Sequence, residues 1–271
     1  MTKLFDTAIA VVTLVSVLLC ATAWSDSNLT AGSAEEAGQR LATEARARQA
    51  GFGNYTASLR MVLRNRQGKE SNRELRLKVI EVEGDGDQTL FVFDRPSDVK
   101  GTAFLVHGHK DKPDRQWLYL PALKRVKSIT SSNQSGSFMG SEFSYEDMGA
   151  AEVEKFDHKY LGDEACGEFQ CYVLERVPKS EDSGYSRMEI LLDQQELRVI
   201  SIRYFDRRQE HLKTMTAEGY EVFLDEFWRS KTNTMTNHLT GKASMLQWSN
   251  FEFQTDLNHR DFSKTALKRV R

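Results

Sequence analysis

Hydrophobic and polar residues alternate along much of this chain. Over residues 55–63, apolar side chains fill every second position and Thr, Ser and Arg fill the others, an order broken only by Val62. This period of two is typical of a strand with one buried face. A turn at residues 65–68 and a second alternating run at residues 75–79 complete a predicted hairpin.

Further apolar runs of strand length follow, each bounded by Gly, Pro or Asp. Helical periodicity is absent between residues 55 and 220. The pattern therefore predicts one mainly β domain with an antiparallel sheet of about ten or eleven strands. The runs after the first hairpin lie at residues 90–93, 103–106, 117–120, 171–176, 188–192, 199–205, 212–216, 222–228 and 243–253.

A sheet of this length has to curl or close, because its apolar face must be covered. Two segments are candidates for the cover. Ser33 and Glu36 form a capping box that opens a helix running to about Ala50. The second candidate is the long connection at residues 128–151, and residues 261–268 are expected to form a short terminal helix.

Within the connection at residues 128–151, residues 131–141 are polar except for Phe138 and Met139, which have glycines on both sides. Loops of this length inside a compact domain are usually functional. We therefore expect a flexible lid or docking plug whose apolar pair gates a cavity. The alternative is a disordered surface excursion that happens to carry two apolar residues.

The N-terminus predicts export. Lys3 precedes an uncharged apolar stretch at residues 7–19, and Ala21-Thr22-Ala23 is a small-x-small cleavage site. We expect a signal peptide at residues 1–23, cleaved to leave a single domain at residues 24–271. A retained anchor is the alternative, but 13 residues are short for a membrane span. Lipidation at Cys20 is disfavoured because Leu18 and Leu19 precede it, where a lipidation site needs small residues.

The cysteines fit an exported protein. Cleavage removes Cys20, and Cys166 and Cys171 remain, with four residues between them. In an oxidising compartment we expect them to form a disulfide across a tight turn. Their spacing is not the Cys-x-x-Cys of a redox motif, and a zinc site would need two more ligands close by.

Charge and motifs narrow the function classes. The chain has 271 residues with 37 Lys and Arg against 39 Asp and Glu, so no net positive charge draws it to nucleic acid. It has no nucleotide-binding loop, dinucleotide fingerprint or nucleophile elbow. We therefore expect no cofactor and no enzymatic activity. His107 and His109 match half of a zinc-hydrolase motif, but Lys112 stands where another His is needed, which favours a hairpin turn.

A basic cluster at Lys124, Arg125 and Lys127 lies in sequence near Trp117 and Tyr119. We interpret this cluster either as the edge of a strand that is protected by charge or as a docking patch for an acidic partner. A nucleic-acid surface is the less favoured interpretation, because the chain is predicted to be exported and has a slight net negative charge.

Four blocks of sequence resemble one bacterial family, the outer-membrane lipoprotein-sorting proteins of the LolA-like group. They are Asp-Arg-Pro-Ser-Asp-Val-Lys-Gly-Thr-Ala-Phe-Leu at residues 94–105, residues 116–126, Gly-Ser-Phe-Met-Gly-Ser-Glu-Phe-Ser-Tyr-Glu-Asp at residues 136–147, and residues 171–175. The resemblance implies an incomplete β-barrel with a lid and an apolar cavity, located in the periplasm and handling lipid or lipoprotein acyl chains. It further implies the branch associated with RND-superfamily, MMPL-type inner-membrane exporters.

The expected function is therefore a monomeric periplasmic carrier, or an exporter accessory, that passes acyl chains toward the outer membrane or a partner transporter. The alternative is an adaptor of an RND-type transporter whose barrel is filled by its own side chains, and a hydrolase acting at His107 and His109 comes third. We expect the ligand to contact apolar and aromatic side chains at Trp117, Tyr119, Phe138, Met139, Phe143 and Tyr145.

Overall fold

The computed structural model describes residues 28–269 of the chain. The expected signal peptide, its cleavage site and Cys20 lie outside the described residues.

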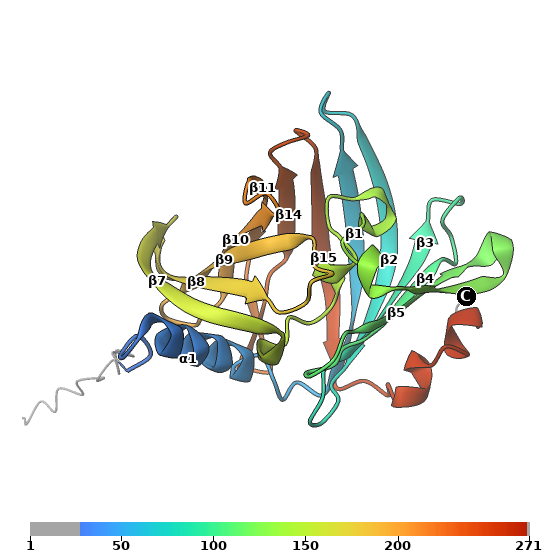
Figure 1. The fold of residues 1–271 in the computed structure, drawn as a ribbon. Helices are drawn as coiled ribbons and strands as arrows, with labels where there is room; N and C mark the ends of the chain where they lie inside the picture. The colour runs from blue at the N-terminus through green and yellow to red at the C-terminus, as the bar shows by residue number, and fades with distance from the viewer. Residues whose placement is uncertain (1–27, 270–271) are drawn as a thin grey trace, which may run out of the picture.

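One antiparallel sheet of 13 strands makes up most of the fold (Figure 1). The first strand, β1, and the last, β15, pair in its middle, and meanders extend from them to the two edges, which are formed by β6 and β7. From edge to edge the strands are β6 (Arg125–Ile129), β5 (Arg115–Leu120), β4 (Ala103–His107), β3 (Gln88–Arg95), β2 (Glu70–Ile80), β1 (Asn54–Arg64), β15 (Ala243–Phe253), β14 (Thr232–Asn237), β11 (His211–Glu218), β10 (Val199–Asp206), β9 (Tyr185–Asp193), β8 (Phe169–Pro178) and β7 (Phe156–Cys166).

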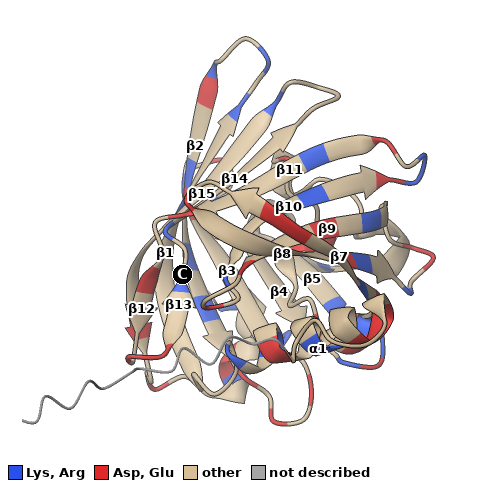
Figure 2. Ribbon diagram, turned by 90° about the vertical axis from the view of Figure 1, so that its left-hand side faces the viewer, with Lys and Arg blue, Asp and Glu red and all other residues tan. Residues whose placement is uncertain are grey.

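The sheet curls but does not close into a barrel, as Figures 1 and 2 show. Because β6 and β7 are consecutive in the chain but lie at opposite edges, their connection has to cross between the edges. This connection carries four short 3₁₀ turns, η2 (Ser131–Asn133), η3 (Phe138–Gly140), η4 (Glu146–Met148) and η5 (Val153–Lys155). Its buried residues belong to the same hydrophobic core as the inner side chains of the sheet. We call residues 130–155 the plug.

The alternation seen in the sequence sets which face is inside. Ala57, Leu59 and Met61 of β1 are buried in the core, whereas Arg60 between them is exposed. Leu59 pairs with Leu75 of β2, so the apolar faces of neighbouring strands coincide. This confirms the predicted hairpin and its one wet face.

Strands β3 to β5 are buried on both faces. Leu90, Val92 and Trp117 pack on the outer side against Phe262 and Leu267 of the C-terminal segment. Double burial explains why β3 and β4 appear in the sequence as continuous apolar runs. The expected terminal helix is instead two short 3₁₀ turns, η6 (His259–Phe262) and η7 (Ala266–Lys268).

The fold class is as predicted, with more strands than expected. The additional strands β6, β7 and β14 are rich in polar residues, so their sequences contain no apolar run. Residues 222–228 were expected to form one strand but fold back as a separate two-stranded hairpin, β12 (Glu221–Phe223) and β13 (Phe227–Arg229). Leu224 and Asp225 adopt positive φ at its turn.

Helix α1 (Ala34–Ala47) begins at the predicted capping box. The Ser33 Oγ accepts from the Glu36 N–H at 3.2 Å, and Glu36 Oε2 accepts from the Ser33 N–H at 3.0 Å. The helix lies across β7 and β8 (Figure 1) and buries Leu41 in the core. Gly38 makes the close approach possible, because a Cβ at this position would lie 2.5 Å from the backbone N and Cα of Lys159.

We predict that Gly38→Ala destabilises the protein. In an exposed helix this change would stabilise by about 1 kcal/mol, but here the added methyl has to displace α1 from β7, which costs about 1–3 kcal/mol. Urea unfolding measures the difference. Gln39→Ala, one residue further on the exposed face, is the control and should be neutral or slightly stabilising. A Gly38→Ala variant as stable as the control would contradict the close packing.

Candidate functional site

A cavity of about 570 Å³ lies between the inner face of the sheet and the plug. We call it the larger cavity. Its floor comes from alternate residues of β9, β10, β11 and β15, and its rim carries charged residues from the plug and from the β4–β5 and β8–β9 turns. The apolar side chains of the floor are Met188, Ile202, Met215, Leu246 and Trp248.

A β-bulge in β10 decides which of its residues reach this cavity. The pairing of β10 with β9 shifts register between Val199 and Ser201. Ile202 therefore faces the cavity, whereas Ile200 packs on the outer face beside Cys171. Alternation alone would place the two isoleucines on the same face, so only the bulge separates them.

The plug is anchored by an aromatic cluster. Phe138 is fully buried, and its ring centre lies 5.1 Å from that of Phe104, 5.8 Å from that of Phe91 and 5.5 Å from that of Tyr145. Met139 adopts a positive φ, and its carbonyl oxygen accepts a hydrogen bond from Arg73. The segment expected to be a flexible lid or docking plug is thus folded, and Phe138 and Met139 pack into the core of the protein.

A buried ion pair fastens the plug to the sheet. Lys213 Nζ of β11 lies 2.7 Å from Asp147 Oδ2 of the plug, and both side chains are about 5% exposed. Lys213 also donates to the Glu142 carbonyl oxygen, and Asp147 accepts from the Tyr185 hydroxyl and the Ser144 N–H. Because both charges are buried, removing one of them would leave the other without a compensating charge.

Glu146 lies next to this pair at the edge of the larger cavity. It accepts hydrogen bonds from the Gly184 N–H at 3.0 Å and the Ser183 hydroxyl at 2.9 Å. Burial raises the pKa of this carboxyl, the Gly184 N–H opposes the shift, and the charge of Asp147 adds to it. The plug therefore presents a carboxyl that protonates more easily than one in water.

A second set of charges ties the end of the plug to α1. Arg46 donates to both carboxylate oxygens of Glu152, at 3.1 and 3.2 Å, and to Asp87 at 3.3 Å. Glu152 is almost fully buried. Burial raises the pKa of Asp87 to about 6, and the Arg46 charge only partly offsets this effect.

The six residues predicted to contact a ligand lie at three locations. Phe143 lines the larger cavity. Phe138, Met139 and Tyr145 belong to the plug core. The remaining two, Trp117 and Tyr119, lie on the outer face with the C-terminal segment. Neither residue lines the larger cavity. Trp117 and Tyr119 are alternate residues of β5, so both side chains point to the outer face of the sheet.

The basic residues Lys124, Arg125 and Lys127 are all exposed. They lie on the β5–β6 turn and on the edge strand β6, which within residues 28–269 pairs only with β5. The neighbouring Leu123 is 55% exposed.

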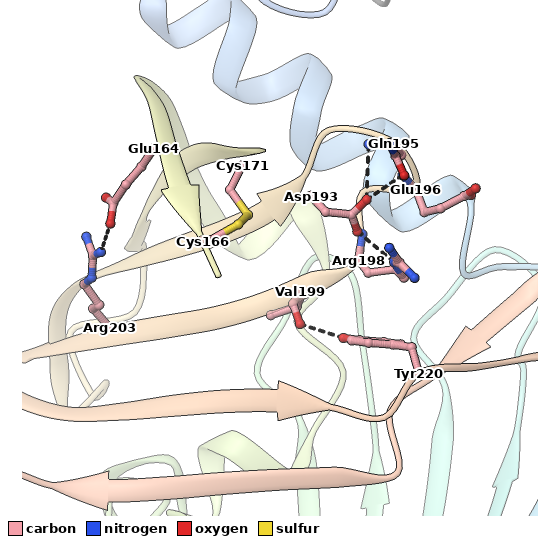
Figure 3. The surroundings of a disulfide bond; sticks show 10 residues. All are labelled: Glu164, Cys166, Cys171, Asp193, Gln195, Glu196, Arg198, Val199, Arg203 and Tyr220. Atoms are coloured by element: carbon pink, nitrogen blue, oxygen red, sulfur yellow. Dashed lines mark hydrogen bonds and ion pairs between the residues drawn. A yellow bond between two sulfur atoms is a disulfide. The ribbon is translucent and has the colours of Figure 1, made fainter. Parts of the chain in front are cut away.

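The disulfide joins Cys166 and Cys171 across the β7–β8 turn, as predicted (Figure 3). It packs on the outer face against Leu191. The bond therefore fixes the hairpin that carries α1 and lies outside the larger cavity.

The two histidines of the hydrolase hypothesis have separate structural partners. His107 Nε2 lies 2.6 Å from the Phe262 carbonyl oxygen, and His109 Nδ1 lies 2.7 Å from Asp85. Within residues 28–269 no three His, Cys, Asp or Glu side chains gather as a potential metal site. In the same part of the chain, no helix has the length and apolar character needed to cross a membrane.

The site residues missed from the sequence include two cationic residues on the inner side of the sheet, Lys213 and Arg176. Lys213, Met215 and Ala217 are the buried alternate positions of β11, so a lysine at an inward position was the available signal. Arg176 lies similarly on the inner side of β8 and lines the larger cavity. Their roles depend on the plug, whose path the sequence does not determine.

A family model described as an uncharacterized protein matches residues 85–269. No curated protein matches the chain. Among solved structures, an outer membrane lipoprotein-sorting protein domain from Vibrio parahaemolyticus is 48% identical with a TM-score of 0.85, covering 87% of this chain and 100% of that one. A DUF1329 family protein from Desulfovibrio piger is 28% identical over the same shares, with a TM-score of 0.83.

A LolA superfamily protein from Nitrosomonas europaea shares the fold, with a TM-score of 0.68 at 17% identity. The match covers 84% of this chain and 98% of that one.

We predict that Asp87→Asn changes how stability depends on pH. Because the folded pKa of about 6 exceeds the ordinary value of 3.8, the folded state binds more protons between these values, and stability falls as pH rises through this window. At pH 7 the variant, which carries no charge, should be more stable than the wild type by about 1–3 kcal/mol. The advantage should vanish near pH 4, as thermal unfolding at both pH values would show.

The control is Asp98→Asn at an exposed position. The difference in stability between this variant and the wild type should be the same at pH 7 and near pH 4. If Asp87→Asn behaved like this control, the carboxyl of Asp87 would not be held in a desolvated site.

Proposed function

The chain belongs to the LolA-like family of outer-membrane lipoprotein-sorting proteins, and from this premise we propose that it carries lipid or lipoprotein acyl chains in the larger cavity. The observation that carries the proposal is the cavity itself. Its volume of about 570 Å³, its apolar floor and its charged rim are those of a site for an amphiphilic ligand. This role requires no catalytic step and no cofactor.

The cavity favours a carrier over an adaptor with a filled barrel. Each buried methylene contributes about 0.8 kcal/mol, so a 16-carbon chain would gain on the order of 12 kcal/mol before any costs. Binding of this strength requires a change of shape or a partner for release. We propose the plug as the part that moves, because it forms one wall of the cavity and joins the two edges of the sheet.

We place this carrier in the periplasm, reached by a cleaved signal peptide, as a single domain that works as a monomer. The disulfide between Cys166 and Cys171 supports an oxidising compartment. The cargo would pass toward the outer membrane or to an inner-membrane transporter of the RND type.

We predict that filling the cavity removes the cargo. Ile202→Trp places a large ring in the larger cavity, so native mass spectrometry of protein purified from its host should show the loss of a lipid-sized adduct present on the wild type. Ile200→Trp is a matched control on the same strand, since Ile200 packs on the outer face. This variant should keep its adduct.

Two outcomes would contradict the carrier. The first is a wild-type protein without any lipid adduct. The second is equal retention of the adduct by the Ile202→Trp variant.

We further propose that the exposed edge at Lys124, Arg125 and Lys127 docks an acidic surface of a membrane transporter. The edge strand β6 has free backbone groups and the cluster has one sign of charge. A photocrosslinker at Lys127 should capture an integral membrane protein in the host, and reversing the charges of Lys124 and Arg125 should abolish this product. A crosslinker at exposed Arg208 is the control and should not give it. Identical products from both positions would contradict specific docking.

A further inference from the structure

A second cavity, of about 270 Å³, lies between α1, the inner ends of β8 to β10 and the β12–β13 hairpin. We call it the smaller cavity. Its lining contains four arginines, Arg46, Arg176, Arg198 and Arg229, and among the described residues that line it there is no Asp or Glu. Four arginines therefore line one small space whose own described lining supplies no carboxylate.

Two of these arginines are balanced by carboxylates behind the cavity wall. Arg198 Nε donates to Asp193 at 2.8 Å, and Asp193 also accepts from the backbone N–H groups of Gln195 and Glu196 (Figure 3). Arg46 is paired with Glu152 as described above. These two side chains are held rigidly at the wall.

The other two arginines are held by neutral groups that fix their position. Arg229 donates to Gln49 and to the Trp228 carbonyl oxygen, and its guanidinium lies 5.2 Å from the centre of the Phe52 ring. The Arg176 guanidinium lies 5.0 Å from the centre of the Phe156 ring. Desolvation lowers the pKa of Arg176 to about 10, and an anion beside it would relieve this cost.

Arg176 lies at the boundary between the two cavities. It lines both of them, together with Ala151 of the plug. A ligand whose hydrocarbon part fills the larger cavity could therefore reach the arginines with a group at its end. Guanidinium groups bind phosphate and carboxylate by paired, charge-assisted hydrogen bonds.

We propose that the smaller cavity binds the oxyanion of an amphiphilic cargo, a phosphate or a carboxylate, with Arg176 and Arg229 as its ligands. The proposal rests on the carrier function and specifies the class of its cargo. In this proposal the arginines select cargo by its charge, which an apolar cavity cannot do.

The test compares two lipids that differ only in the phosphate, monopalmitoylglycerol and its phosphate ester, binding to the full mature protein below their micellar concentrations. Isothermal titration calorimetry should show that the phosphate ester binds about tenfold tighter or better. Arg176→Gln and Arg229→Gln should each reduce this preference, which is the ratio of the two affinities, to less than about threefold.

Arg203→Gln is the matched control. Arg203 lies on β10, is paired with Glu164 (Figure 3) and with Glu189, and lines neither cavity. The preference should therefore persist in this variant. Arg176→Lys keeps the charge and should keep part of the preference. Thermal unfolding of each variant shows whether it is folded, and the comparison of the two lipids on the wild type needs no variant.

The outcomes separate the two proposals. Equal affinity of the wild type for both lipids would overturn the oxyanion site while the carrier stands. Binding of neither lipid would count against the carrier itself. Millimolar inorganic phosphate identifies the source of the anion: displacement of the phosphate ester supports a site that also takes free phosphate, whereas no displacement supports recognition of a lipid headgroup.

Discussion

The structure depends on one constraint: a curled sheet of 13 antiparallel strands that stays open has an apolar inner face that must be covered. Its two edge strands are neighbours in the chain, so the segment between them has to cross the opening. That crossing segment is the plug, which closes the core with Phe138 and leaves the larger cavity beside it. A closed barrel would need no such cover.

Charges inside the protein hold the cover in one position. Lys213 with Asp147 fastens the middle of the plug to β11, and Arg46 with Glu152 fastens its end to α1. Buried ion pairs add little net stability, because desolvation offsets their attraction. They do make a single arrangement preferable to others, and for a carrier they mark contacts that opening would have to break.

Under the carrier proposal, the two cavities divide the recognition of an amphiphile between two kinds of surface. The larger cavity offers apolar side chains to a hydrocarbon chain. Such hydrophobic binding is strong but does not discriminate between chains of similar length. The smaller offers arginines, which discriminate by charge. Arg176 of β8 lines both cavities and therefore lies where the two kinds of surface meet.

The sequence by itself determined the elements that depend on local order: the capped helix at Ser33, the alternation of β1, the doubly buried run of β3 and the disulfide across the β7–β8 turn. Periodicity and short-range spacing encode such features. Strand β14 pairs with β11 and β15, although its polar sequence contains no apolar run that would predict a strand. Other features depend on long-range pairing and on the path of the plug. They are the bulge that turns Ile202 inward, the outward orientation of Trp117 and the four arginines that line the smaller cavity. Only the tertiary structure decided them.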